Sequence, residues 1–282
     1  MLIDIEKINF IHFSGGEVHL NAVDFFKELP ENTDGDDVIW APIRNSDDLM
    51  ELLILTDAYK RHYLRTPKVC IPYIPYARQD RVANDGEALS IKVFADIINA
   101  QNYPIVYVMD PHSEVSMALI NNAKAITTVN DEYLKKIVPN YCEQFYVVLA
   151  PDAGSFKRLS KVIKDVPLIY ATKSRDTKTG ALSNVEIHTS NVDLDGKTIL
   201  VVDDICDGGG TFLLLAEALR RAHITNDLEL YVTHGIFSKG TDVLYKSFYP
   251  IYTTNSFFQG YDSNVKVYNL KEYFMKGELK WQ

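Results

Sequence analysis

Short runs of apolar, often β-branched residues alternate along the chain with longer segments in which apolar residues recur at helical spacing. Apolar runs of about four to eight residues between turn signals are typical of strands that are buried on both faces. They predict strands at residues 7–12, 37–42, 68–73, 105–109, 146–150, 168–170, 199–202 and 228–233. Helical spacing predicts helices at residues 47–61, 90–100, 114–121, 131–137, 154–164 and 211–222. This alternation predicts an α/β fold with mainly parallel sheets flanked by helices.

The alternation runs through the chain twice. The strand at 105–109 ends in Asp110 and leads into a helix, and the strand at 199–202 ends in Asp203 and Asp204 and does the same. We therefore expect two α/β domains, residues 1–140 and residues 141–282. In such sheets ligands bind beyond the carboxyl ends of the strands. Most of the candidate residues below follow a predicted strand end.

Composition and charge narrow the class of protein. The chain has 282 residues, of which 46% are hydrophobic, so two packed domains are possible. Its net charge of -9 argues against general nucleic-acid binding. Three widely separated cysteines, Cys70, Cys142 and Cys206, argue against a disulfide framework and fit a reducing compartment. Without a signal-peptide pattern or a long apolar run, we expect a cytoplasmic protein.

The segment TILVVDDICDGGGTFL, residues 198–213, carries the most informative candidate chemistry. A buried strand, an acidic pair, a glycine-rich turn and a helix follow one another directly. Glycines let backbone N–H groups approach a phosphate closely, and a helix N-terminus favours negative charge. The spacing fits neither a Walker loop nor a dinucleotide-binding loop. The acidic pair, Asp203 and Asp204, indicates ribose hydroxyls or a metal beside the phosphate.

Other segments place charged side chains after predicted strands. Arg78 and Arg81 would present guanidinium donors to phosphate oxygens, or form a solvated surface turn. His112 could bind a metal or polarise a phosphate. Asp152 could bind Mg²⁺ or cap a helix. The basic run at 172–178 is either an exposed loop or a lid whose cations meet phosphate charge.

Several of these motifs resemble those of one family. VVDDICDGGGT resembles the phosphoribosyl-pyrophosphate-binding loop of phosphoribosyltransferases and of ribose-phosphate pyrophosphokinases. Tyr-Ala-Arg-Gln-Asp-Arg at 76–81 matches the ATP-binding segment of the pyrophosphokinases, which simple phosphoribosyltransferases do not carry. Phe-Ser-Gly-Gly-Glu at 13–17 resembles the adenine-contacting loop of the pyrophosphokinases, with Gly15 in place of aspartate. The resemblance to the pyrophosphokinases runs through almost the whole chain.

This resemblance implies two tandem phosphoribosyltransferase-like domains and a homo-oligomer with ATP sites at subunit interfaces. It implies a Mg²⁺-dependent enzyme of nucleotide biosynthesis that moves the β,γ-diphosphate of ATP onto the anomeric hydroxyl of ribose 5-phosphate, giving phosphoribosyl pyrophosphate and AMP. The residues that it assigns are Phe13, Glu17, Arg78, Gln79, Asp80, Arg81 and His112 for ATP; Asp203, Asp204, Asp207, Gly208, Gly209, Gly210 and Thr211 for ribose phosphate; His112 and Asp152 for the metal; and Lys173, Arg175 and His112 for catalysis.

Departures from the family pattern leave the acceptor open. The family usually has Asp-Thr-Gly-Gly-Thr in the phosphate loop, and this chain has Gly208 in place of the first threonine. Together with Gly15, this suggests an acceptor with a larger 5-substituent, such as ADP-ribose, which would connect the enzyme to NAD metabolism. Ser174 stands where the family's catalytic loop has its middle arginine. A phosphoribosyltransferase and a non-catalytic, synthetase-associated regulatory protein are the other hypotheses.

Overall fold

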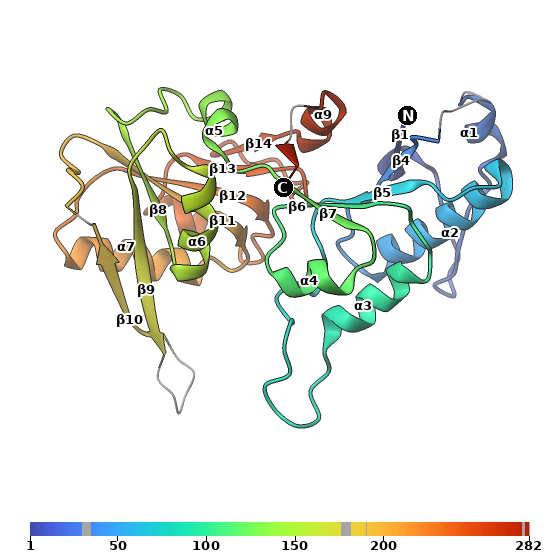
Figure 1. Cartoon of the computed structure of the whole chain (residues 1–282), viewed down its shortest axis with the longest axis horizontal. Helices are drawn as coiled ribbons and strands as arrows, with labels where there is room; N and C mark the ends of the chain where they lie inside the picture. Colours follow the sequence, from blue (N-terminus) through green and yellow to red (C-terminus); the bar gives the residue numbers. More distant parts are fainter. Residues whose placement is uncertain (30–34, 176–181, 190, 278–279, 282) are drawn as a thin grey trace. The chain divides into compact units, whose positions relative to one another are not determined.

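A computed structural model of the chain describes residues 1–29, 35–175, 182–189, 191–277 and 280–281. The chain folds into two compact units, which are described separately below (Figure 1). Unit 1 comprises Met1–Thr127 together with Lys271–Gln282, and unit 2 comprises Thr128–Leu270. Each unit has its own sheet, so the predicted α/β class is confirmed. Within the described residues, no helix is both long enough and apolar enough to span a lipid bilayer.

The sheet of unit 1 has six strands in the order β1–β4–β5–β6–β7–β15. Their bounds are Leu2–Asp4 (β1), Val38–Trp40 (β4), Lys68–Ile71 (β5), Val106–Met109 (β6), Ala123–Thr127 (β7) and Lys280–Trp281 (β15). Neighbouring strands are parallel, except that β15 runs antiparallel to β7. A separate antiparallel hairpin is formed by β2 (Ile11–His12) and β3 (Val18–His19).

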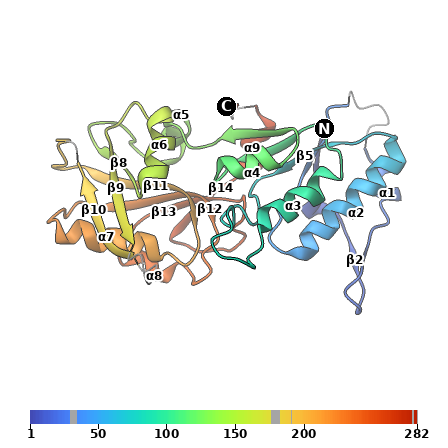
Figure 2. The same cartoon turned by 60° about the horizontal axis from the view of Figure 1, so that its bottom comes forward.

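Helices cover both faces of this sheet. They are the short 3-10 helix η1 (Ile5–Lys7), α1 (Val23–Lys27), α2 (Ser46–Tyr63), α3 (Ser90–Asn99), α4 (Glu114–Leu119) and α9 (Leu270–Met275). Figure 2 shows α2 and α3 together, and apolar side chains of both belong to the buried cluster that includes Ile39, Val69 and Val106. Because side chains alternate along a strand, Trp40 points to the other face. There its ring lies 5.9 Å from that of Phe274 in α9.

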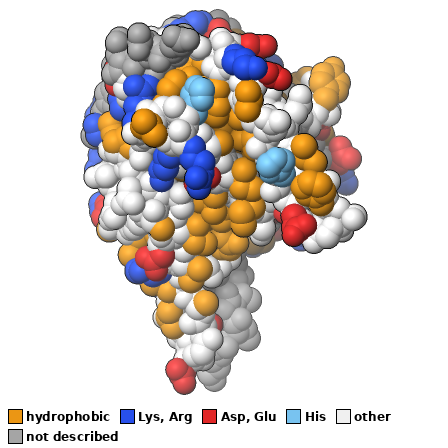
Figure 3. Space-filling view, turned by 90° about the vertical axis from the view of Figure 1, so that its right-hand side faces the viewer, with side chains coloured by type: hydrophobic (Ala, Val, Ile, Leu, Met, Phe, Trp, Pro, Cys, Tyr) orange, Lys and Arg blue, Asp and Glu red, His pale blue; other side chains and the backbone are white. Residues whose placement is uncertain are grey.

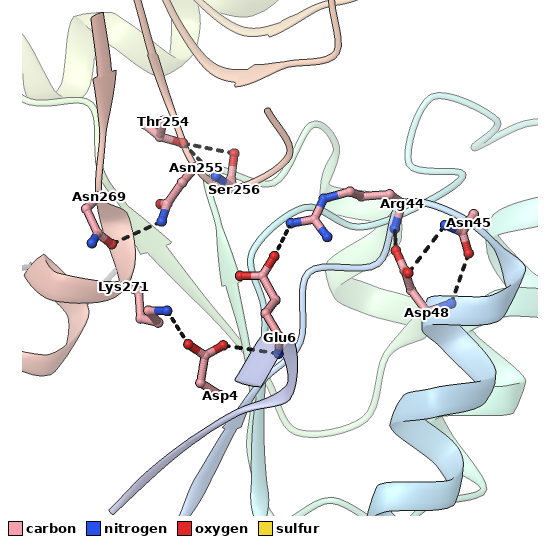
Figure 4. A network of polar contacts seen from close by, with 10 residues as sticks. All are labelled: Asp4, Glu6, Arg44, Asn45, Asp48, Thr254, Asn255, Ser256, Asn269 and Lys271. Carbon is pink, nitrogen blue, oxygen red and sulfur yellow. Dashed lines mark hydrogen bonds and ion pairs between the residues drawn. The ribbon is translucent and has the colours of Figure 1, made fainter. Parts of the chain in front are cut away.

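The observed units differ from the expected domains 1–140 and 141–282. Strand β15 extends the sheet of unit 1, and Lys271 forms an ion pair with Asp4 at the end of β1 (Figure 4). Residues 128–140 belong to unit 2, where α5 (Asp131–Ile137) begins with a buried carboxylate. Asp131 accepts hydrogen bonds from the backbone of Lys164, at 2.5 Å, and Asp165, at 3.0 Å. The contacts of Lys271 with Asp4 and of Asp131 with residues 164–165 join segments that are far apart in the sequence, so local sequence patterns do not reveal them.

The sheet of unit 2 has seven strands in the order β10–β9–β8–β11–β12–β13–β14. Their bounds are Tyr146–Ala150 (β8), Leu168–Arg175 (β9), Leu182–His188 (β10), Thr198–Cys206 (β11), Leu228–Gly235 (β12), Ile251–Thr254 (β13) and Val265–Tyr268 (β14). Its helices besides α5 are α6 (Ala153–Val162), α7 (Gly210–Arg221) and α8 (Asp242–Tyr245). All neighbouring strands are parallel except β10, which runs antiparallel to β9.

Helices α6 and α7 lie on opposite faces of this sheet (Figure 1). The apolar face of α7, which includes Leu215, packs against Val201 of β11 and Ile169 of β9. Tyr170, the next residue along β9, faces the other way and lies with its ring 4.5 Å from that of Phe156 in α6. The central strand β11 is therefore enclosed on both sides, which fixes the position of the acidic residues near its carboxyl end.

Candidate active site

The acidic pair lies inside strand β11 rather than after it. We expected the strand to end at Val202, but it continues to Cys206 because β12 runs beside it, with Asp203 opposite Val232 and Cys206 opposite Gly235. On its other side, β11 pairs with β8 only as far as Val201. Asp203 and Asp204 therefore lie in the part of β11 that pairs with β12 alone. On the side where β8 no longer pairs, α6 contacts the two residues.

Helix α6 supplies the contacts of the acidic pair. The hydroxyl of Ser155 donates to Oδ1 of Asp203 at 2.6 Å. Nη2 of Arg158 lies 3.0 Å from the same oxygen and 3.2 Å from Oδ1 of Asp204. Burial and the negative charge of Asp204 raise the pKa of Asp203 to about 8, while Arg158 and Ser155 act in the opposite direction. The pair thus forms an acidic centre that favours a neighbouring positive charge.

Sequence reasoning did not identify Ser155 or Arg158. A signal for both is present, because Asp152, Ser155 and Arg158 recur at intervals of three and share one face of a helix. What the sequence cannot show is that this face turns toward the end of β11. The two residues act on the candidate site by holding the acidic pair, and Arg158 balances part of its charge.

Asp152 follows β8 and caps helix α6. Its Oδ1 accepts a hydrogen bond from the backbone N–H of Ser155 at 2.9 Å, the geometry of an N-cap. The capping role considered for Asp152 is therefore observed, and a metal-binding role stays a prediction. Because β8 and β11 are adjacent, Ser155 connects the Asp152 turn directly to Asp203. The structure thus brings together the two acidic segments that the sequence placed far apart.

The glycine-rich turn forms the start of α7. Gly209 is the N-cap residue, has a φ of 76° and makes no side-chain capping bond. A Cβ at this position would lie 2.9 Å from Cδ2 of Leu244, so glycine is required by both conformation and space. The helix begins at Gly210, and Thr211 lies in its first turn. A helix N-terminus without a side-chain cap is suited to bind an anion through its backbone amides.

The segment after β12 lies against this turn. The backbone N–H groups of Ile236 and Phe237 both donate to the carbonyl oxygen of Cys206, at 2.8 and 3.1 Å. The hydroxyl of Ser238 donates to Oδ1 of Asp207 at 2.5 Å. Asp207 is therefore engaged within the turn itself. The predicted ribose-phosphate residues from Asp203 to Thr211 consequently form one continuous structure in unit 2.

The predicted ATP residues of unit 1 follow two adjacent strands. The segment that contains Arg78, Gln79, Asp80 and Arg81 comes after β5, and His112 comes after β6. The backbone N–H of Met109, at the end of β6, donates to the carbonyl oxygen of Pro72 at 3.1 Å, so the two exits are joined. Both arginines and the histidine are exposed at this edge. The structure therefore brings these segments to one edge of the sheet, as expected.

Two residues at these exits have unusual backbone conformations. Tyr76 has a φ of 62°, and Asp110, which is only 4% exposed, has a φ of 36°. Residues other than glycine rarely adopt a positive φ, and those that do are concentrated at binding and catalytic sites. Asp110 lies two residues before His112, so its conformation sets the direction of the chain that carries the histidine.

The hairpin that contains Phe13 and Glu17 is separate from these exits. The N–H of Phe13 donates to the carbonyl oxygen of Glu17 at 2.9 Å, and the hairpin contacts α2 where Nε2 of His12 lies 3.0 Å from Oε1 of Glu51. It projects beyond α2 (Figure 2). Figure 3 shows exposed hydrophobic side chains on the side of unit 1 that includes α1 and α2 in Figure 1. In the hairpin, Ile11 and Phe13 are about half exposed.

The predicted catalytic run begins within strand β9 rather than in a loop. Lys173 lies opposite Val185 and Arg175 opposite Leu182 in the antiparallel pairing of β9 with β10. Local polarity suggested a loop, but pairing between the two strands extends the ladder through these positions. The structure describes the backbone of both residues, while their side chains, and residues 176–181, lie outside the described part.

Comparisons with known proteins give a family-model match in each half of the chain. A model of the N-terminal domain of ribose phosphate pyrophosphokinase matches residues 2–101, and a model of the phosphoribosyl transferase domain matches residues 116–264. A phosphoribosylpyrophosphate synthetase from Mycobacterium smegmatis has the same fold. Its structure matches with a TM-score of 0.76 and 20% identity, over 98% of this chain and 96% of that one.

Sequence relatives agree with these matches. A ribose-phosphate pyrophosphokinase of Thermococcus kodakarensis is 31% identical over 198 residues, which cover 68% of this chain and 66% of the relative. A ribose-phosphate pyrophosphokinase of Brucella melitensis is 31% identical over 226 residues, covering 77% of this chain and 70% of the relative. The relatives are enzymes that carry the family's name. The chain therefore belongs to the ribose-phosphate pyrophosphokinase family.

Proposed function

We propose that the protein transfers the β,γ-diphosphate of ATP to the anomeric hydroxyl of ribose 5-phosphate, giving phosphoribosyl pyrophosphate and AMP. The hydroxyl oxygen forms a bond to the β-phosphorus, the bond from that phosphorus to the oxygen of the α-phosphate breaks, AMP leaves and the hydroxyl proton is released. The observation that carries the proposal is the acidic pair, Asp203 and Asp204, near the carboxyl end of β11, which is followed by the glycine-rich turn and the start of α7 without a side-chain cap. Family membership supplies the reaction class.

The acceptor roles follow from the chemistry of this segment. Asp203 and Asp204 present carboxylate oxygens, which accept hydrogen bonds from ribose hydroxyls. The backbone amides of Gly208, Gly209 and Gly210, together with the hydroxyl of Thr211, would bind the 5-phosphate at the start of α7. Asp207 holds the turn in place through Ser238. The ribose and its phosphate would thereby be fixed by one strand end and one helix start.

The ATP roles rest on unit 1. Arg78 and Arg81 are exposed cations that would bind phosphate oxygens, and Gln79 and Asp80 lie between them. His112, at the neighbouring strand exit, would polarise the phosphates. Phe13 and Glu17 lie in the separate hairpin, and we propose that they meet the adenine of an ATP bound at an interface between copies. The exposed Ile11 supports such a homo-oligomer.

The charge that develops on the transferring group needs cations. We propose that Lys173 and Arg175, together with His112, stabilise that charge, because positively charged groups aimed at developing charge supply much of the catalysis in such transfers. Lys173 and Arg175 both lie in β9, in the part of the strand whose backbone pairs with β10.

We propose Mg²⁺ as the metal, and the residues present fit this ion. Mg²⁺ is usually held by one or two carboxylates together with substrate phosphates and water. Among the residues that the structure describes, no group of three or more His, Cys, Asp and Glu side chains forms a complete metal site. Asp203 and Asp204 offer a carboxylate pair, and Asp152 and His112 are further candidates. A bound Mg²⁺ would neutralise phosphate charge during the transfer.

A larger acceptor is the alternative form of this proposal. At position 208 the family's usual threonine is replaced by glycine, which removes a side chain next to the phosphate-binding turn. ADP-ribose, which carries a diphosphate and a nucleoside on its 5-oxygen, would use that change, and the reaction would then belong to NAD metabolism.

We also propose a reducing, cytoplasmic compartment, since Cys70, Cys142 and Cys206 are all free thiols.

The experiment incubates the purified protein with ATP, Mg²⁺ and either ribose 5-phosphate or ADP-ribose, and identifies the products by mass. We expect AMP together with an acceptor that has gained a diphosphate. Substitution Asp204→Asn should lower kcat/KM by about tenfold or more, because it removes one charge of the buried pair. Asp227→Asn is the matched control, since Asp227 is exposed and precedes β12, far along the sheet from the acidic pair.

Three outcomes would overturn this function. Absence of AMP with both acceptors would exclude the pyrophosphokinase. Release of pyrophosphate that depends on an added base and phosphoribosyl pyrophosphate would show a phosphoribosyltransferase. A protein without turnover that changes the rate of another synthetase would be a regulatory partner. Equal loss of activity in Asp204→Asn and Asp227→Asn would remove the acidic pair from the acceptor site.

A further inference from the structure

A tight turn after β12 is fixed against the start of the glycine-rich segment. Two backbone N–H groups, of Ile236 and Phe237, converge on the carbonyl oxygen of Cys206, and Phe237 has a φ of 48°. The N–H of Gly240 closes the turn by donating to the carbonyl oxygen of Phe237 at 2.8 Å. The backbone is thus constrained at three positions of the turn, Ile236, Phe237 and Gly240. The side chains of this turn have defined positions relative to the loop at residues 207–211.

Lys239 of this turn lies over Gly208. A Cβ built on Gly208 would be 3.3 Å from both Cδ and Cε of Lys239 and 3.6 Å from its Cγ. The preceding residue, Ser238, is anchored to Asp207 at 2.5 Å. The lysine stem therefore occupies the space next to the glycine that a larger residue at 208 would need. Its ammonium is one bond beyond Cε, at the same loop.

The ammonium of Lys239 is available for a ligand. Lys239 is exposed, and it makes no hydrogen bond or ion pair with another residue in the part of the chain that the structure describes. Other exposed lysines are engaged locally, such as Lys92 with Asp96 and Lys276 with Glu272. The aliphatic part of such a lysine packs on the backbone while its ammonium group stays in water. The ammonium can therefore bind an anion without first breaking an ion pair with another residue.

We infer that Lys239 is a specificity-determining residue of the acceptor site, which binds the anionic phosphate or diphosphate carried by the 5-oxygen of the ribose. This inference rests on the proposed function and deepens it. Gly208 lacks the hydroxyl that the family's threonine would offer, and its small size lets Lys239 lie across the turn. The ammonium of Lys239 thus takes the place of the threonine hydroxyl as the donor to the anion. Because the lysine side chain is flexible, this site can accept a longer anionic substituent.

The test measures acceptor binding by calorimetry and acceptor KM in the same preparations. Lys239→Met keeps the stem and removes the charge, and we expect it to weaken acceptor binding about tenfold or more, as for loss of a charged hydrogen bond. Lys239→Arg should restore most of the affinity. Gly208→Ala should also weaken binding, since its Cβ displaces the stem, and should add little in the Lys239→Met background. The KM for ATP should stay unchanged in all three.

A control variant and a comparison of two acceptors distinguish the possible outcomes of this test. Lys161→Met removes an exposed lysine from the last turn of α6 and should leave acceptor affinity unchanged. Weakening for both ribose 5-phosphate and ADP-ribose places Lys239 at the first phosphate, and weakening for ADP-ribose alone places it at the second. Wild-type acceptor affinity in Lys239→Met, with normal AMP formation, would overturn this inference but leave the proposed function intact. A wild-type protein that binds neither acceptor would overturn both.

Discussion

Arg158 of α6 and Asp203 of β11 form an ion pair at 3.0 Å, and the same guanidinium nitrogen reaches Asp204 at 3.2 Å. The carboxylates are largely buried, with side chains 12% and 4% exposed, so their mutual repulsion is poorly screened by water. The guanidinium of Arg158 therefore interacts with both carboxylates. Burial and Asp204 raise the pKa of Asp203, and Arg158 opposes part of that rise.

Substitution Arg158→Met should destabilise the protein by about 1–3 kcal/mol at pH 8, because it leaves the buried acids without their cation. The loss should be smaller at pH 5, where a proton on Asp203 takes over part of the neutralisation. Urea denaturation at both pH values measures it. Arg220→Met, which removes an exposed arginine bonded to Ser247, is the control. Equal stability of the two variants at pH 8 would contradict the role of Arg158.

The raised pKa of Asp203 predicts the pH dependence of stability. Between the ordinary value of 3.8 and about 8, the folded protein holds a proton on Asp203 that the unfolded chain releases. This stabilising contribution is complete below 3.8 and is lost as the pH rises through about 8. Asp203→Asn should therefore reduce the fall in unfolding free energy between pH 5 and pH 8.5 by at least about 1.4 kcal/mol, the value of one pKa unit. An unchanged slope relative to Asp227→Asn would contradict this.

The two glycines at the start of α7 should differ in their response to alanine. Gly209→Ala places a Cβ in a left-handed conformation and 2.9 Å from Leu244, and should cost about 1–2 kcal/mol or more. Gly210→Ala meets nothing within 4 Å and lies inside the helix, so stability should be equal or slightly higher. Thermal denaturation of the pair tests this, and similar losses in both variants would argue against the geometry of the turn.

The three cysteines should react at different rates in the native protein. Burial raises the pKa of the Cys70 thiol and removes it from solvent, and Cys206 is equally inaccessible. Cys142 is half-buried. Titration with a thiol reagent should modify Cys142 first, and the other two only after unfolding in urea. Rapid modification of all three without denaturant would show that one of the two sheets opens readily.

Substitution Arg81→Met should raise the KM for ATP about tenfold while the acceptor KM stays the same, because it removes one phosphate-binding cation from the exit of β5. Arg61→Met is the matched control, since Arg61 is an exposed arginine that pairs with Asp57 on α2. Steady-state kinetics with each substrate varied in turn measures both constants. A rise in the acceptor KM alone would move Arg81 to the other substrate.

The sequence predicts well those features that depend on nearby residues. The glycine-rich turn, the start of the apolar strand before it and the helix after it were expected within one or two residues, since spacing and turn chemistry are local. Helix α2 was expected at 47–61 and runs from Ser46 to Tyr63. Asn45 begins it as an N-cap whose side chain accepts from Asp47 and Asp48.

Features that depend on pairing between distant segments were not predicted. Strand β11 extends four residues past Val202 only because β12 continues beside it. Near the N-terminus, a strand was expected at 7–12, but η1 and β2 occupy this region, and β1 pairs with β4 instead. The roles of Arg158 and Lys239 rest on contacts with segments more than 30 positions away in the chain. Charge and periodicity alone do not reveal such contacts.

The pairing of β15 with β7 has a consequence for how the protein is made. Because unit 1 combines residues 1–127 with a strand at 280–281, its sheet cannot be completed until residues 280–281 have left the ribosome. Unit 2 is one unbroken stretch, so its residues are all present earlier during synthesis. A gene segment that encodes residues 128–270 should therefore yield a folded fragment, whereas residues 1–127 alone would expose the edge of β7 and aggregate.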